Sequence, residues 1–104
     1  MALKIQVTGL AEDGFTSAEI WSDNGYAGRV FELETGWHVH LIEPERLLDH
    51  GFVEAVLAAR KALLHYVNRT GKGMPAGSTA AGASLWLMQR DDGRGFTIPA
   101  RKLP

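Results

Sequence analysis

The stretch from Glu45 to Arg69 constrains the fold more than any other, because it is the only long segment with a helical apolar pattern. At about 100° per residue, a second group of apolar residues, Val53, Leu57 and Leu64, lies roughly 120° around the helix from Phe52. The first group, which shares an arc of roughly 100° with Phe52, contains Leu48, Val56, Ala59, Leu63, Tyr66 and Val67. One such arc is typical of a helix on a core. Two arcs predict that another part of the chain covers the second group.

The sequence allows two starting points for this helix. Pro44 fits the first helical position, where a missing N–H costs nothing. Gly51 disfavours a continuous helix, so the alternative is a separate turn from Pro44 to His50 and a second helix capped by Asp49. Gly71 is the expected stop.

The residues before this helix alternate between polar and apolar side chains in short runs, as strands with one buried face do. Asn24-Gly25 is typical of a two-residue hairpin turn, and Thr35-Gly36 indicates another turn. Gly28 indicates a bulge or a close backbone approach. The expected strands are Leu3 to Thr8, Ser17 to Ser22, Tyr26 to Glu34 and Trp37 to Ile42.

The predicted fold class is therefore α+β: an antiparallel four-stranded meander with one long helix packed on one face. A Gly-rich linker and a C-terminal β-strand or hairpin follow. The single domain divides into a sheet-plus-helix core (residues 1–70), a flexible linker (71–84), and a C-terminal strand or hairpin with a basic tail (85–104).

The apolar run Leu85-Trp86-Leu87-Met88 is predicted to be a strand, and Phe96 to Ile98 a further one. We expect the run at residues 85–88 to cover Val53, Leu57 and Leu64 within the same molecule. In the alternative interpretation the run stays exposed and recruits a partner or a second copy of the chain.

Composition excludes several function classes. The 104 residues include no cysteine, which excludes thiol catalysis and cysteine-ligated zinc. No apolar run of about 20 residues and no signal-peptide pattern is present, so we expect a cytoplasmic protein without membrane contact. Residues 1–59 carry ten acidic and three basic side chains, whereas residues 60–104 carry two acidic and eight basic ones. The basic half either attracts the acidic half within the fold or serves an anionic partner.

Two histidines on one strand face are the candidate metal ligands. His38 and His40 lie about 7 Å apart along a strand, a spacing that some zinc sites use. A site would need a third ligand, for which Glu32, Glu34, His50 or His65 are candidates. The competing interpretation is an ordinary solvated strand face.

The second candidate surface combines apolar and basic residues near the C-terminus. Its members are Trp86, Leu87, Met88, Arg90, Arg94 and Phe96. Aromatic side chains with basic residues between them are typical of surfaces that bind single-stranded nucleic acid. Trp86, flanked by Leu85 and Leu87, resembles a buried anchor more than a stacking platform.

No catalytic motif stands out, and no cofactor is expected. The sequence favours a non-catalytic protein-binding or regulatory module, with a protein partner or a homodimer as its assembly. One alternative is a nucleic-acid-binding protein that uses the basic C-terminal half. The other is a metal-binding protein or small enzyme that uses His38 and His40.

Overall fold

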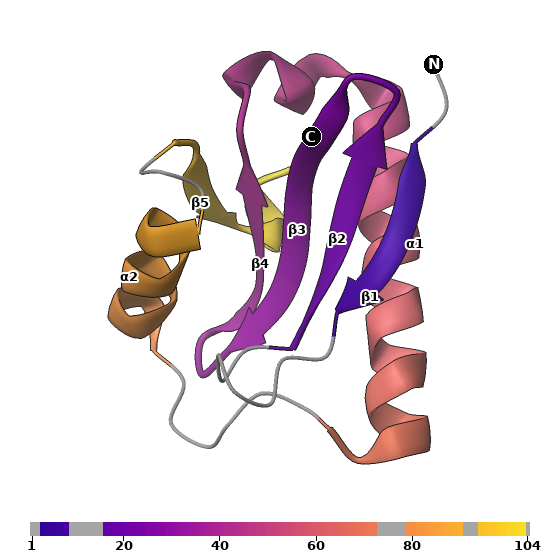
Figure 1. The fold of residues 1–104 in the computed structure, drawn as a ribbon, viewed down its shortest axis with the longest axis vertical. Coiled ribbons are helices and arrows are strands. Elements are labelled where there is room, and N and C mark those ends of the chain that lie inside the picture. Colours follow the sequence, from indigo (N-terminus) through magenta and orange to yellow (C-terminus); the bar gives the residue numbers. More distant parts are fainter. Residues whose placement is uncertain (1–2, 9–15, 73–78, 91–93, 104) are drawn as a thin grey trace.

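The computed structural model describes residues 3–8, 16–72, 79–90 and 94–103. They form one antiparallel sheet whose strands follow each other in chain order (Figure 1). The strands are β1 (Lys4–Thr8), β2 (Ser17–Ser22), β3 (Gly25–Leu33), β4 (Gly36–Leu41) and β5 (Phe96–Pro99). The helices are the 3-10 turn η1 (Pro44–Leu48), α1 (His50–Thr70), α2 (Ala80–Arg90) and the 3-10 turn η2 (Ala100–Lys102). The four-stranded meander, the long helix and the C-terminal strand are as predicted.

Glycines form the turns of the meander as the sequence indicates. Gly25 and Gly36 have φ angles of 115° and 112°, which side chains with a Cβ rarely adopt. At Gly28 the backbones of β3 and β4 approach closely, as predicted, because a Cβ at this position would clash with the carbonyl oxygen of His40. The two neighbouring strands therefore tolerate only glycine there.

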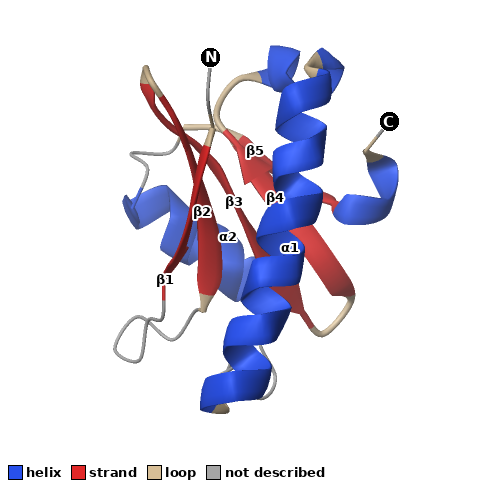
Figure 2. Cartoon of the chain, turned by 90° about the vertical axis from the view of Figure 1, so that its right-hand side faces the viewer, coloured by secondary structure: helices blue, strands red, loops and turns tan. Residues whose placement is uncertain are grey.

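The long helix packs across β1, β2 and β3 on one side of the sheet, hereafter the α1 face (Figure 2). Its predicted core residues Phe52, Val56 and Leu63 are buried in one hydrophobic cluster with Val39 and Leu41 of β4. The other buried members of the cluster are Ala18, Ile20, Ala27, Val30, Ala55 and Ala59. Alternation along the strands thus produces one continuous apolar layer under α1.

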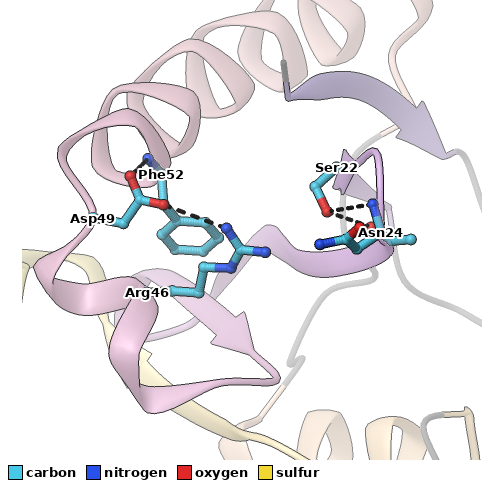
Figure 3. A network of polar contacts seen from close by, with 6 residues as sticks. Ser22, Asn24, Arg46, Asp49 and Phe52 are labelled. Carbon is cyan, nitrogen blue, oxygen red and sulfur yellow. Dashed lines mark hydrogen bonds and ion pairs between the residues drawn. The ribbon is translucent and has the colours of Figure 1, made fainter. Parts of the chain in front are cut away.

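The start of α1 follows the second of the two sequence alternatives. Pro44–Leu48 forms the separate turn η1, and Asp49 caps α1 by accepting a hydrogen bond of 3.2 Å from the amide of Phe52 (Figure 3). This hydrogen bond lowers the pKa of the Asp49 carboxyl group, and Arg46, whose Nη1 is 3.3 Å from Oδ2, lowers the pKa further. The predicted core position of Leu48 is wrong, because the early break in the helix leaves this side chain almost fully exposed.

Ser22 reinforces the first hairpin turn. Its hydroxyl accepts a hydrogen bond from the amide of Asn24 and donates one to the carbonyl of Gly25 (Figure 3). At the other end of the core, Gly71 stops α1 in a left-handed conformation and donates to the carbonyl of Val67 at 2.8 Å.

The C-terminal apolar run is a helix and not the predicted strand. Leu85 to Met88 belongs to α2 rather than to a strand, and the end of the predicted linker, residues 80–84, is helical as well. The middle of that linker, residues 73–78, lies outside the described residues. Ala83 and Leu87 are one turn apart and pack on Phe31 and Leu33, on the side of the sheet opposite α1 (Figures 1 and 2). We call this side the α2 face.

No helix within the described residues is long and apolar enough to cross a membrane.

Candidate functional site

The second apolar group of α1 remains open to solvent. Leu57 is 59% exposed and Leu64 is 51% exposed. The predicted cover is wrong, because α2 packs on the opposite face of the sheet, against Phe31 and Leu33. Leu57 and Leu64, together with half-buried Val53, therefore form an apolar surface of α1 in the described structure.

This surface continues into a hollow of about 430 Å³, which we call the α1 groove. One wall is α1, and the others are the start of β4 with its preceding turn and the C-terminal turn η2, which lies beside α1 (Figure 2). The residues that line the α1 groove include Trp37, Val53, Leu57, Arg60, Arg101 and Leu103. The volume falls within the range of about 300–1,000 Å³ that is common for ligand pockets.

A stacked arginine lies in the α1 groove. The Cζ atom of Arg60 is 4.9 Å from the ring centroid of Trp37, which is the geometry of a cation–π contact. A guanidinium group that is held over a ring keeps its edge N–H donors available for a carboxylate. Arg101 lines the same groove from η2, and both arginines are exposed.

A second, smaller hollow extends the surface toward the start of α1. Leu47, Leu48, His50 and Val53 line its volume of about 270 Å³. Val53 belongs to both hollows. The apolar surface therefore runs along α1 from η1 to the α1 groove.

Among the residues that the structure describes, the basic side chains of the C-terminal half form no ion pair with the acidic half. Within the described residues, the ion pairs are Arg29–Glu19, Arg46–Asp49 and His50–Glu54, all before residue 60. The exposed cations Arg60, Lys61, Arg101 and Lys102 make no ion pair with a carboxylate in this part of the chain. The described structure thus gives no support to the interpretation that the opposite charges attract each other within the fold.

The predicted C-terminal surface is divided by the fold. Leu87 is buried on the α2 face, and Trp86 packs beside it with its ring 4.8 Å from Cζ of Arg29. Phe96 is half-buried in β5 and packs on the core of the α1 face. Arg94 is exposed.

Two more residues of that set, Met88 and Arg90, lie in the last turn of α2. Their side chains are outside the described part of the structure. Residues 86 and 87 therefore anchor α2 on the sheet, which matches the buried-anchor interpretation of Trp86. They do not form one patch with Phe96, which faces the other side.

The α2 face holds a buried polar cluster that the sequence analysis missed. Arg29 is 2% exposed, and its Nε donates to the hydroxyl of Tyr26 at 2.6 Å. Its Nη2 lies 3.9 Å from Oε2 of Glu19, and its Nη1 lies 3.5 Å from the hydroxyl of Ser17. Thr8 donates to the same carboxylate at 2.5 Å. The sequence offered one signal for this cluster, the opposite charges of Glu19 and Arg29 on two strands that a hairpin turn joins. The structure pairs these two positions across β2 and β3.

The two candidate metal ligands share the α2 face, but this face is not solvated there. His38 and His40 are both buried, which corrects the interpretation of a solvated strand face. The Nδ1–H of His38 donates to the carbonyl of Gly36 at 2.8 Å, and the ring stacks on Phe31. His40 Nδ1 lies 3.2 Å from the hydroxyl of Thr97.

A metal site needs at least one more ligand. Among the described residues, no group of three or more histidine, aspartate or glutamate side chains could hold a metal ion. The proposed third ligand is therefore not brought to His38 and His40 in that part of the chain, and the metal site stays a prediction of the sequence.

Comparisons with protein families, with characterised proteins and with solved structures found no match. The assignment of function therefore depends on the site itself.

Proposed function

We propose that the protein is a non-catalytic protein-binding module. Its docking surface is the α1 groove together with the stripe on α1 that Val53, Leu57 and Leu64 form. The observation that carries this proposal is the exposure of Leu57 and Leu64 beside a hollow of about 430 Å³. Contiguous exposed apolar surface next to polar residues is characteristic of protein interaction sites.

The shape of the surface supports recognition of a partner segment. Val53, Leu57 and Leu64 lie on one side of α1 at spacings of four and seven residues, as in helices that pair with another helix. The hollow beside them can take an apolar side chain from the partner. Trp37 and Arg60 belong to the residue types that most often dominate binding energy at interfaces.

Nucleic-acid binding is the alternative that uses the same exposed cations, Arg60, Lys61, Arg101 and Lys102. Contacts to phosphates would use these cations but would leave the two leucines exposed to water. An interface with a protein uses both kinds of side chain, which favours the protein partner.

The test compares affinity-tagged full-length protein with two variants that place a charge on an exposed leucine. Leu57→Glu alters the docking surface, whereas Leu85→Glu is the matched control on α2, where Leu85 is 60% exposed. Thermal unfolding first establishes that both variants fold. Quantitative mass spectrometry then identifies proteins retained from a lysate of the host cell.

We expect at least one protein to be retained by the unmodified chain and by Leu85→Glu but not by Leu57→Glu. If all three chains retain the same proteins, or if only Leu85→Glu loses its partner, the α1 groove is not the docking surface.

A further inference from the structure

We infer that the partner segment bound by the α1 groove is acidic as well as apolar. This inference rests on the proposed function and specifies the chemistry of the partner. It follows from the cations that surround the groove, of which Arg60 comes from α1 and Arg101 from η2. Two chain segments far apart in sequence thus bring positive charge to the same hollow.

The guanidinium group of Arg60 has a defined place in the α1 groove. Its Cζ atom lies 4.9 Å from the ring centroid of Trp37, so the ring restricts the conformations of a long side chain. Less conformational entropy is then lost when a carboxylate binds. A planar guanidinium also accepts a carboxylate through two parallel hydrogen bonds.

These cations are not neutralised by the chain itself in the part that the structure describes. Lys61 follows Arg60 on the exposed side of α1, and Lys102 follows Arg101 in η2. Every ion pair there joins residues before position 60. An acidic segment would therefore find two cations in the wall of one apolar hollow and a further cation next to each in sequence, without having to displace a carboxylate of these described residues.

A second copy of this chain does not fit the same surface. In a two-fold symmetric contact through α1, Arg60 and Lys61 of one molecule would face the same cations of the other. Like charges in that position disfavour the pair. A contact between α1 of one copy and a different surface of the next would produce a ring or an open chain of molecules. We therefore take the occupant to be a segment of another protein, and self-association is one of the outcomes that the experiment tests.

The stripe on α1 also sets the length of the segment. Val53 and Leu64 are separated by eleven residues, or about 16 Å along a helix. A partner segment of about three helical turns would span this distance, with leucine-sized side chains toward Leu57 and carboxylates toward Arg60 and Arg101.

The experiment selects peptides from a random phage-displayed library on the full-length protein, with counter-selection on Leu57→Glu. A selected peptide is then synthesised together with its amide counterpart, in which Asn and Gln replace Asp and Glu. Binding of both peptides to the unmodified chain and to Arg60→Gln, Arg101→Gln and the control Leu85→Glu is measured by calorimetry.

We expect the selected peptides to be acidic and rich in large apolar residues. Two or three exposed ion pairs lost together weaken binding about tenfold, so the amide peptide should bind about tenfold more weakly than the acidic one. Arg60→Gln and Arg101→Gln should each weaken binding of the acidic peptide, and Leu85→Glu should not.

Selected peptides without acidic residues, or equal affinity for the acidic and amide peptides, would overturn the acidic partner and leave the docking function intact. Failure to select any peptide that prefers the unmodified chain over Leu57→Glu would overturn both. A dimer in light scattering that Leu57→Glu disrupts, or a single-stranded oligonucleotide that binds in place of any peptide, would likewise contradict the inference.

Discussion

Arg29 shows that the alternation of a strand decides which face a side chain occupies but not what surrounds it there. The alternation of β3 puts Arg29 on the face away from α1, beside Glu19 of β2. A buried charge is tolerated only when it is paired and hydrogen-bonded. Tyr26, Ser17 and Glu19 provide those contacts, and the ring of Trp86 covers the guanidinium. The cover comes from α2, whose position the sequence analysis did not predict.

Two leucines on α1 make a matched test of the helix orientation. Leu63 is buried against the sheet, whereas Leu57 is 59% exposed. Leu63→Ala should lower the free energy of unfolding by about 2–5 kcal/mol, because it removes buried methyl groups and leaves a cavity. Leu57→Ala should change it by less than about 0.5 kcal/mol. Urea denaturation measures both, and similar losses for the two variants would contradict the orientation of α1.

The elements that the sequence predicted well are those whose ends carry local signals. Asn24-Gly25 forms a turn, and Asp49 and Gly71 delimit α1, because each acts through its own backbone conformation or side chain. The run at residues 85–88 has no such signal, since a short apolar run fits a buried strand or a helix equally well. The contacts of Leu87 with Phe31 and Leu33, which decide in favour of the helix, are visible only in three dimensions.

The cap of α1 gives a pH-dependent prediction. Its carboxylate is stabilised in the folded state by the amide of Phe52 and by Arg46, so the folded pKa lies below the unfolded value of 3.8. A lowered folded pKa means that the stabilisation is complete above the unfolded pKa and is lost as the pH falls through the folded pKa.

An asparagine in place of Asp49 can still cap the helix but has no charge. The unmodified chain should therefore have a higher urea midpoint than Asp49→Asn at pH 7, and the difference should shrink below about pH 4. The other carboxyl groups titrate in both chains, so their effect cancels in the difference between the two urea midpoints. A difference that grows on acidification would exclude this role of Asp49.

The packing of α2 on the sheet gives a second prediction about a single helix. Leu87 is buried on the α2 face, whereas Leu85, two residues earlier, is 60% exposed. Leu87→Ala should destabilise the fold by about 2–5 kcal/mol if α2 unfolds together with the sheet. Leu85→Ala is the control and should have little effect. Equal thermal unfolding of both variants and the unmodified chain would show that α2 contributes nothing to the stability of the core.

For the molecule as a whole, the fold brings Arg60 and Arg101, two basic residues from distant parts of the chain, to one apolar groove. The sequence revealed both ingredients, the second stripe of α1 and the charge asymmetry. It did not reveal that they meet, because the α1 groove is built from α1, Trp37 and the C-terminal residues 99–103, which are distant in the sequence. The cover expected over the stripe lies on the other face instead.

The three tryptophans of the chain allow the docking surface to be located in one titration. Trp37 lines the α1 groove, Trp86 lies on α2, and Trp21 is partly exposed on β2. Each indole N–H gives one signal in the proton–nitrogen NMR spectrum of labelled full-length protein, assigned from Trp→Phe variants. When the selected acidic peptide is added, we predict that the Trp37 signal shifts while those of Trp21 and Trp86 stay in place. A shift of Trp86 or Trp21 with an unchanged Trp37 signal would contradict docking at the α1 groove.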